Sequence, residues 1–102
     1  MTKPEKKTEK KLLRPGRDLI ATKTESFRKR LIKAVELAKR EVVLDFAKVE
    51  KVDSVGLGLI IAAHNTLKGR GGKLTLINVS KEMQGLFLAT RLDRQFEVNV
   101  VE

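Results

Sequence analysis

The residues that could do chemistry gather in one short stretch, Val52 to Gly58, which reads VDSVGLG. It places an acid, a hydroxyl and two glycines at the start of what otherwise has the pattern of an apolar helix. Asp53 or Ser54 is expected to cap that helix by accepting a backbone N–H, since both residue types favour the N-cap position. Capping does not explain Gly56 and Gly58, because each glycine costs a helix about 0.5–1 kcal/mol relative to alanine.

Two uses of the glycines remain open. Either the turn packs closely against a neighbouring strand, or the backbone of a partner approaches a surface without side chains, and both uses exploit the missing Cβ. The same turn presents free N–H groups and the positive end of a helix dipole, which accommodate an anion. A phosphate on a hydroxyl here would add about −1.5 to −2 charges to a docking surface and could expel a bound partner.

Other chemistries have weaker support. His64 falls on the apolar stripe of the same helix, which is more typical of a packed, hydrogen-bonded residue than of a catalytic base, and it is the single histidine of the sequence. Asp45 and Asp53 are more typical of turn and cap positions than of acid–base catalysis. The absence of cysteine excludes thiolate chemistry and disulfides. We therefore expect no enzymatic activity, no metal site and no cofactor.

Composition favours one small soluble domain. Of the 102 residues 41% are apolar, which is enough for a single core. No segment reaches the roughly 20 apolar residues of a membrane span, and no apolar run makes the basic N-terminus a signal peptide, so we expect a cytoplasmic protein without membrane insertion. The net charge of +9 can attract acidic proteins, lipid headgroups or nucleic acid. Because the chain has no Tyr or Trp to stack on bases, direct nucleic-acid binding is not expected.

The elements that position the stretch follow the order β-α-β-α-β-α-β. Residues 1–11 mix lysine and glutamate without an apolar period and are expected to form a charged flexible tail, with the domain over residues 12–102. The expected elements are a brief strand before Pro15, a helix over 24–39, a strand over 41–46, a helix over 55–68, a strand over 73–79, a helix from Ser80 and a strand over 96–101. This order predicts an α/β domain with a mostly parallel, mixed sheet, and it puts Val52–Gly58 at the carboxyl ends of the strands, where sites form in such sheets.

Three motifs resemble the STAS domain of bacterial anti-sigma factor antagonists. They are Asp-Ser-x-Gly-Leu at Asp53–Leu57, Gly-Gly-Lys-Leu at Gly71–Leu74 and Leu-Asp-Arg-x-Phe at Leu92–Phe96, within a resemblance that runs from about Leu19 to Val98. The resemblance implies a small α/β domain that binds an anti-sigma factor, usually a histidine-kinase-like serine kinase, and thereby frees a sigma factor. The partner-binding residues that it implies are Asp53, Ser54, Val55, Gly56, Leu57 and Gly58, with Asp18 as a further docking residue.

Two departures from the family pattern bear on regulation and assembly. The resemblance implies a phosphate-accepting hydroxyl immediately before the first glycine, where this sequence has Val55. Ser54 is then the possible phosphorylation site, although a shift of one residue rotates a side chain by about 100° around a helix. Binding is therefore expected to be constitutive or regulated on the partner's side. The N-terminus has room for one strand where the family has two, and the edge left open could pair with a second copy, which makes a homodimer possible.

Two other function classes stay open. STAS domains also occur in sulphate permeases and phospholipid-import complexes, so the chain could be an accessory subunit of a membrane transporter that docks through the same turn. Co-purification with membranes would distinguish that role. A less favoured alternative is a basic nucleic-acid-binding protein, which predicts a steep salt dependence of retention on DNA.

Overall fold

The fold is that of a computed structural model, which describes residues 8–101. Its elements are β1 (Thr8–Leu13), β2 (Asp18–Leu19), the 3₁₀ turn η1 (Ala21–Lys23), α1 (Glu25–Leu37), β3 (Ala38–Asp45), β4 (Lys51–Val52), α2 (Ser54–Lys68), β5 (Lys73–Val79), α3 (Lys81–Ala89), the 3₁₀ turn η2 (Leu92–Arg94) and β6 (Glu97–Val100). The long strands form one sheet in the order β1-β3-β5-β6, and β2 pairs with β4. Because all of these pairs are parallel, the predicted α/β domain with a mostly parallel sheet is confirmed.

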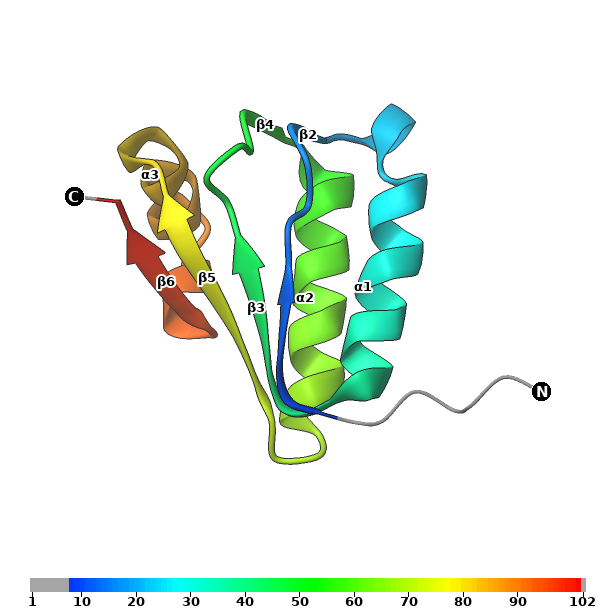
Figure 1. Cartoon of the computed structure of the whole chain (residues 1–102). Helices are drawn as coiled ribbons and strands as arrows, with labels where there is room; N and C mark the ends of the chain where they lie inside the picture. The colour runs from blue at the N-terminus through cyan, green and yellow to red at the C-terminus, as the bar shows by residue number, and fades with distance from the viewer. Residues whose placement is uncertain (1–7, 102) are drawn as a thin grey trace.

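The helices cover one face of the sheet, behind the strands in Figure 1. Alternate side chains of the central strands point to that face and are buried, as Val42 and Leu44 on β3 and Leu74 and Leu76 on β5 show. α1 and α2 run side by side in the same direction, from the carboxyl ends of the long strands down to their amino ends (Figure 1). The first turn of α2 therefore lies at the carboxyl edge of the sheet, as the sequence predicts.

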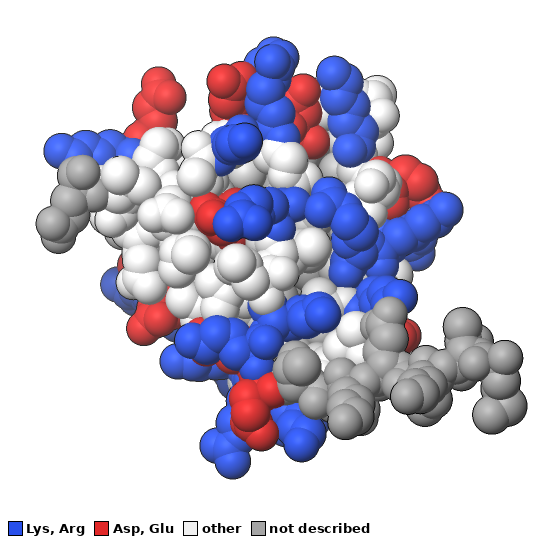
Figure 2. Space-filling model, viewed as in Figure 1, with Lys and Arg blue, Asp and Glu red and all other residues white. Residues whose placement is uncertain are grey.

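The opposite face of the sheet carries charged side chains. Glu41 pairs with Lys10 at 3.4 Å and with Lys73 at 3.8 Å, and Asp45 pairs with Arg14 at 3.4 Å. Figure 2 views the molecule from this side and shows lysine and arginine spread among white apolar and uncharged polar surface, with acidic groups between them. Glu41 and Asp45 are thus both paired with cations on this face of a strongly basic chain.

The expected N-terminal tail, residues 1–11, requires a correction. Residues 8–11 belong to β1, because Lys10 and Lys11 pair in register with Glu41 and Val42 of β3. These residues are polar, so the sequence has no apolar alternation that would indicate a strand here. Residues 1–7 lie outside the described residues. With β1 and β2, the chain has two strands before its first helix and not the one expected. The possible homodimer through an open edge remains a prediction, and the edge in question is now that of β1.

Arg70, in the loop after α2, ties the lower ends of the two long helices together. Its guanidinium donates to the carbonyl oxygen of Val35 and, at 3.0 Å, to that of Ala38. Val35 lies in the last turn of α1, where backbone oxygens lack partners within the helix, and Ala38 follows that turn as the first residue of β3. Over residues 8–101 we find no helix with the length and apolar character needed to cross a membrane.

Candidate partner-docking site

The expected docking residues meet at one corner of the molecule, formed by β2, β4 and the first turn of α2 (Figure 1). Asp18 and Leu19 of β2 pair with Lys51 and Val52 of β4. The amide of Asp53 then donates to the carbonyl oxygen of Leu19 at 3.1 Å. This short ladder brings Asp18 beside the stretch 53–58, although the two are far apart in sequence.

Asp53 holds this corner together with both carboxylate oxygens. Its Oδ1 accepts from the backbone N–H of Val55 at 2.9 Å and of Gly56 at 3.1 Å, which makes Asp53 the N-cap of α2. Its Oδ2 accepts from the backbone N–H of Ala21 at 2.9 Å. The hydrogen bonds from Ala21, Gly56 and Val55 hold the pKa of Asp53 below its ordinary value. The predicted cap is confirmed, and both oxygens of this carboxylate accept hydrogen bonds from the chain's own backbone.

The two glycines of the turn have different surroundings. A Cβ on Gly56 would lie 2.2 Å from the carbonyl oxygen of Leu19 and 2.9 Å from its Cβ, distances at which atoms overlap. Gly56 is therefore explained by close packing of α2 against β2. A Cβ on Gly58 would meet nothing within 4 Å, and Gly58 is exposed. Packing within the described chain therefore does not explain Gly58.

Three of the expected residues face outward, and we call them the docking surface: Ser54, Val55 and Gly58. Val55 is 44% exposed, which is high for a large apolar side chain, and Ser54 beside it is exposed as well. The offset of one residue therefore does not hide the Ser54 hydroxyl. Leu57 differs from these, because it is half-buried and packs against the core.

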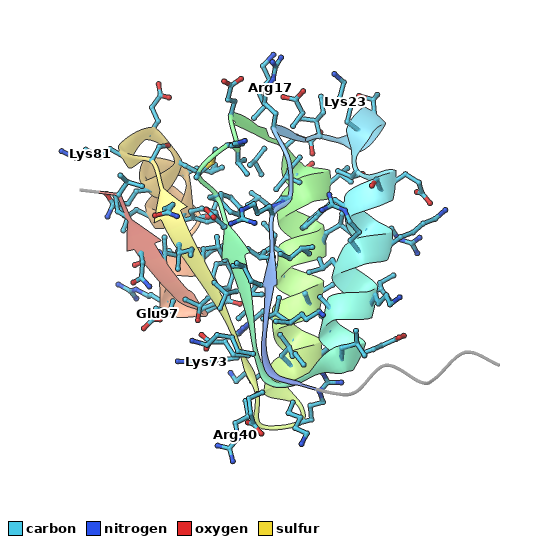
Figure 3. The ribbon with its side chains drawn as sticks, viewed as in Figure 1. Arg17, Lys23, Arg40, Lys73, Lys81 and Glu97 are labelled. Carbon is cyan, nitrogen blue, oxygen red and sulfur yellow. The ribbon has the colours of Figure 1, made fainter. Side chains whose placement is uncertain are left out.

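Asp18 lies at this corner, but its carboxylate is largely shielded from solvent. Its side chain is 12% exposed and lies between two cations, with Lys23 Nζ 3.4 Å from Oδ2 and Arg17 Nε 3.9 Å from Oδ1. Arg17 also pairs with Glu50 of the facing segment at 3.3 Å. Arg17 and Lys23 lie at this end of the molecule in Figure 3. Sequence reasoning did not assign them to the site, because strands of two residues carry no periodic signal.

His64 is a packing residue, as expected. It is buried, and its ring meets the edge of the Phe96 ring at a centroid distance of 5.5 Å. The expectation that it is hydrogen-bonded does not hold for Nδ1, which has no hydrogen-bond partner in the described part of the chain. Burial lowers the pKa of His64, and the nearby charge of Lys68 lowers it further. Among residues 8–101 no three or more histidine or acidic side chains are grouped as a metal site would require.

Comparison with known families agrees with this architecture. The sequence matches the STAS domain family over residues 3–101, nearly the whole chain. The chain belongs to the STAS domain family. The resemblance seen in the three sequence motifs is thereby confirmed.

Solved structures share the fold of this STAS domain. Thermotoga maritima TM1081, assigned as an anti-sigma factor antagonist, has a TM-score of 0.81 and 20% identity, over 95% of this chain and 84% of that one. The anti-sigma factor antagonist SpoIIAA of Bacillus, in its unphosphorylated form, has a TM-score of 0.72 and 21% identity, over 96% and 86%. A sulfate transporter family protein from Wolinella succinogenes has a TM-score of 0.74 and 14% identity, over 94% and 80%. No curated protein sequence matches this STAS domain.

Proposed function

We propose that this STAS domain is a non-enzymatic antagonist of an anti-sigma factor. It would bind a histidine-kinase-like serine kinase in the bacterial cytoplasm and free the sigma factor that the kinase holds, which is regulation of transcription by partner switching. The single observation that carries the docking site is the contrast between the two glycines, since Gly56 is needed by the fold and Gly58 is open to a partner. Likeness in fold to SpoIIAA and TM1081 supports the same class of partner.

In this proposal the partner lies directly on the docking surface. Val55 supplies an exposed apolar contact, and Gly58 lets the partner's backbone come close to α2. The Asp53 carboxylate acts indirectly, because it fixes the N-terminus of α2 from which these residues project. Asp18 with its two cations supports the neighbouring ladder and would contact a partner only at its exposed rim.

Control of docking would fall on Ser54, which carries the one hydroxyl in the sequence Asp53–Gly58. Its phosphate would lie at the N-terminus of α2, where backbone amides and the helix dipole favour negative charge, so the helix would stay folded. The added charge would instead meet the partner and weaken docking. SpoIIAA, which shares this fold, exists in a phosphorylated form. Without a phosphate on Ser54, docking would be constitutive or regulated on the partner's side, because the neighbouring Val55 has no hydroxyl.

The test is capture of partners from the lysate of the native organism, with ATP present and the retained proteins identified by mass spectrometry. Wild type should retain a histidine-kinase-like ATPase, and Gly58→Leu should lose it. Gly85→Leu is the matched control, because Gly85 is an exposed glycine in the middle of α3 and a Cβ there also meets nothing within 4 Å. Equal retention by wild type and a folded Gly58→Leu variant would refute docking through this surface.

A second candidate function is that of an accessory subunit of a membrane transporter. The observation in its favour is the shared fold with the sulfate transporter family protein of Wolinella succinogenes. In that case the same capture experiment would retain a permease or a transporter ATPase, and the protein would fractionate with membranes. Loss of that partner by Gly58→Leu would keep the docking surface and change the function class.

A further inference from the structure

A groove runs along the outer side of the helical layer, between α1 and α2. It has a volume of about 390 Å³. The floor is apolar and buried, made by Leu31 and Val35 of α1 and Ala63 of α2. Ile32 stands on its rim and is 47% exposed, one of few large apolar side chains in the described chain that water reaches so freely. The groove therefore combines a dry floor with an open apolar wall.

The groove continues the docking surface along α2. Leu59 and Ala62 line it and follow Val55 on one face of the helix, at spacings of four and three residues. On α1, Arg28, Ile32 and Glu36 line the other side at spacings of four. α1 and α2 are neighbours that run in the same direction (Figure 1), and the groove lies between them. From Leu59 to Thr66, its last lining residue on α2 before the turn, it extends about 10 Å, or two helical turns.

Charge and shape limit what can occupy this groove. Arg28 lies at the end nearer the docking surface, so an acidic side chain is favoured at that end. Glu36 and Arg70 line the other end with opposite charges, so that end favours neither sign. A site for a small molecule normally encloses most of the ligand's surface. A groove with a half-exposed rim residue such as Ile32 does not provide that enclosure. A protein helix needs no such enclosure, and small Ala62 lets a helix axis come close.

We infer that this groove binds a second segment of the docking partner, a two-turn amphipathic helix. Its apolar side chains, spaced by three or four residues, lie on the floor, and a carboxylate on the same helix meets Arg28. The helix packs beside α1 and α2 as a third helix of the layer. The inference rests on the proposed function for the identity of the partner, and it specifies how much of that partner the domain contacts.

The test places a photo-reactive amino acid at position 32, with position 88 as the control. Leu88 of α3 is exposed to a similar degree, 52%, and lies outside the groove. Irradiation of the complex with the captured partner should join position 32 to a peptide that is helical in the partner and carries an acidic residue beside its apolar ones. Position 88 should give no such product. Absence of cross-linking at position 32 from a stable complex, or cross-linking to a segment without that pattern, would overturn the inference.

Affinity separates this inference from the proposed function. Ile32→Glu puts a charge at the groove and should weaken binding of the partner by about tenfold or more, whereas Leu88→Glu should leave it unchanged. Both positions are half exposed, so both variants should fold; Ile32→Ala repeats the test without a charge. If Gly58→Leu loses the partner while both Ile32 variants bind like wild type, the groove inference fails and the docking surface stands. If Gly58→Leu binds normally while the Ile32 variants do not, the docking surface fails and the groove stands.

Discussion

Gly56 and Gly58 stand two residues apart in α2 and are predicted to respond oppositely to the same added methyl group. Gly56→Ala should lower the free energy of unfolding by about 1–3 kcal/mol, because the new Cβ would push α2 away from the Leu19 carbonyl oxygen of β2. Gly58→Ala should raise it by about 0.5–1 kcal/mol, since alanine is the better helix former and meets no neighbour. Urea denaturation measures both. Equal stability of the two variants would contradict the packing described for Gly56.

Because of His64, the free energy of unfolding is predicted to decrease in mild acid. Its pKa in the folded protein is below the ordinary value because the ring is buried, and the charge of Lys68 adds to the effect. The unfolded chain therefore takes up the proton first as the pH falls. The stabilising contribution is fully present above about pH 6.5 and is lost as the pH drops toward the lower pKa of the folded protein.

Thermal unfolding at about pH 8 and about pH 5.5 checks this for His64, since the ordinary histidine pKa lies between these values. The melting temperature of wild type should fall more than that of His64→Leu, which has no titrating group at this position. An equal fall in the two proteins would show that other groups cause the pH dependence.

Ser54 is predicted to be the residue at which charge controls docking. Ser54→Asp should keep the fold, because an acid is tolerated at the first turn of a helix, and it should weaken binding of the partner. Ser54→Ala should bind like wild type and should block any phosphate uptake when the purified kinase and ATP are added. Isothermal titration measures the binding and mass spectrometry of the intact protein measures the phosphate. Phosphate uptake by Ser54→Ala would place the modification elsewhere.

At the scale of elements, Arg70 is predicted to fix the end of α1. Removing its guanidinium in Arg70→Ala leaves the carbonyl oxygens of Val35 and Ala38 without this donor, at an expected cost of roughly 1 kcal/mol. Arg40→Ala is the control, because Arg40 is 82% exposed and pairs only at the surface with Glu9. Chemical denaturation together with amide hydrogen exchange in the last turn of α1 would detect the difference. Similar behaviour of the two variants would assign Arg70 no such role.

The elements also show which parts of the fold a sequence can predict. The strand expected at 73–79 is β5, and the helix expected from Val55 begins one residue earlier, because long apolar patterns reveal buried elements. β2 and β4 have two residues each, which is too short for a periodic pattern. They form because they pair with one another, so the local sequence does not predict them. Residues 8–11, the first part of β1, have the composition of a solvated tail, since an edge strand can carry lysine and glutamate on its open side.

The candidate site divides in the same way. The cap by Asp53 and the place of the turn at the carboxyl edge of the sheet follow from residue types and element order. The separate roles of Gly56 and Gly58 could not be predicted, because they depend on where the Leu19 carbonyl oxygen lies. The shielding of Asp18 by Arg17 and Lys23 depends on the pairing of β2 with β4, which the sequence does not predict.

At the scale of the whole molecule, the net charge of +9 affects how the protein associates with any charged partner. It attracts a partner with an acidic surface, which agrees with the carboxylate that the groove beside Arg28 favours. It also repels a second copy of the same chain. A homodimer through the free edge of β1 remains a prediction and would have to overcome that repulsion, since Lys10 and Lys11 lie on the edge strand itself.

The central claim is that a partner docks on the surface of Ser54, Val55 and Gly58, and the most direct measurement is the dissociation constant of the captured partner for three proteins. Wild type and Gly85→Leu should bind equally, and Gly58→Leu should bind about tenfold or more weakly without any loss of stability. That result would locate the interface on the first turns of α2. Equal affinity of all three folded proteins would contradict the account.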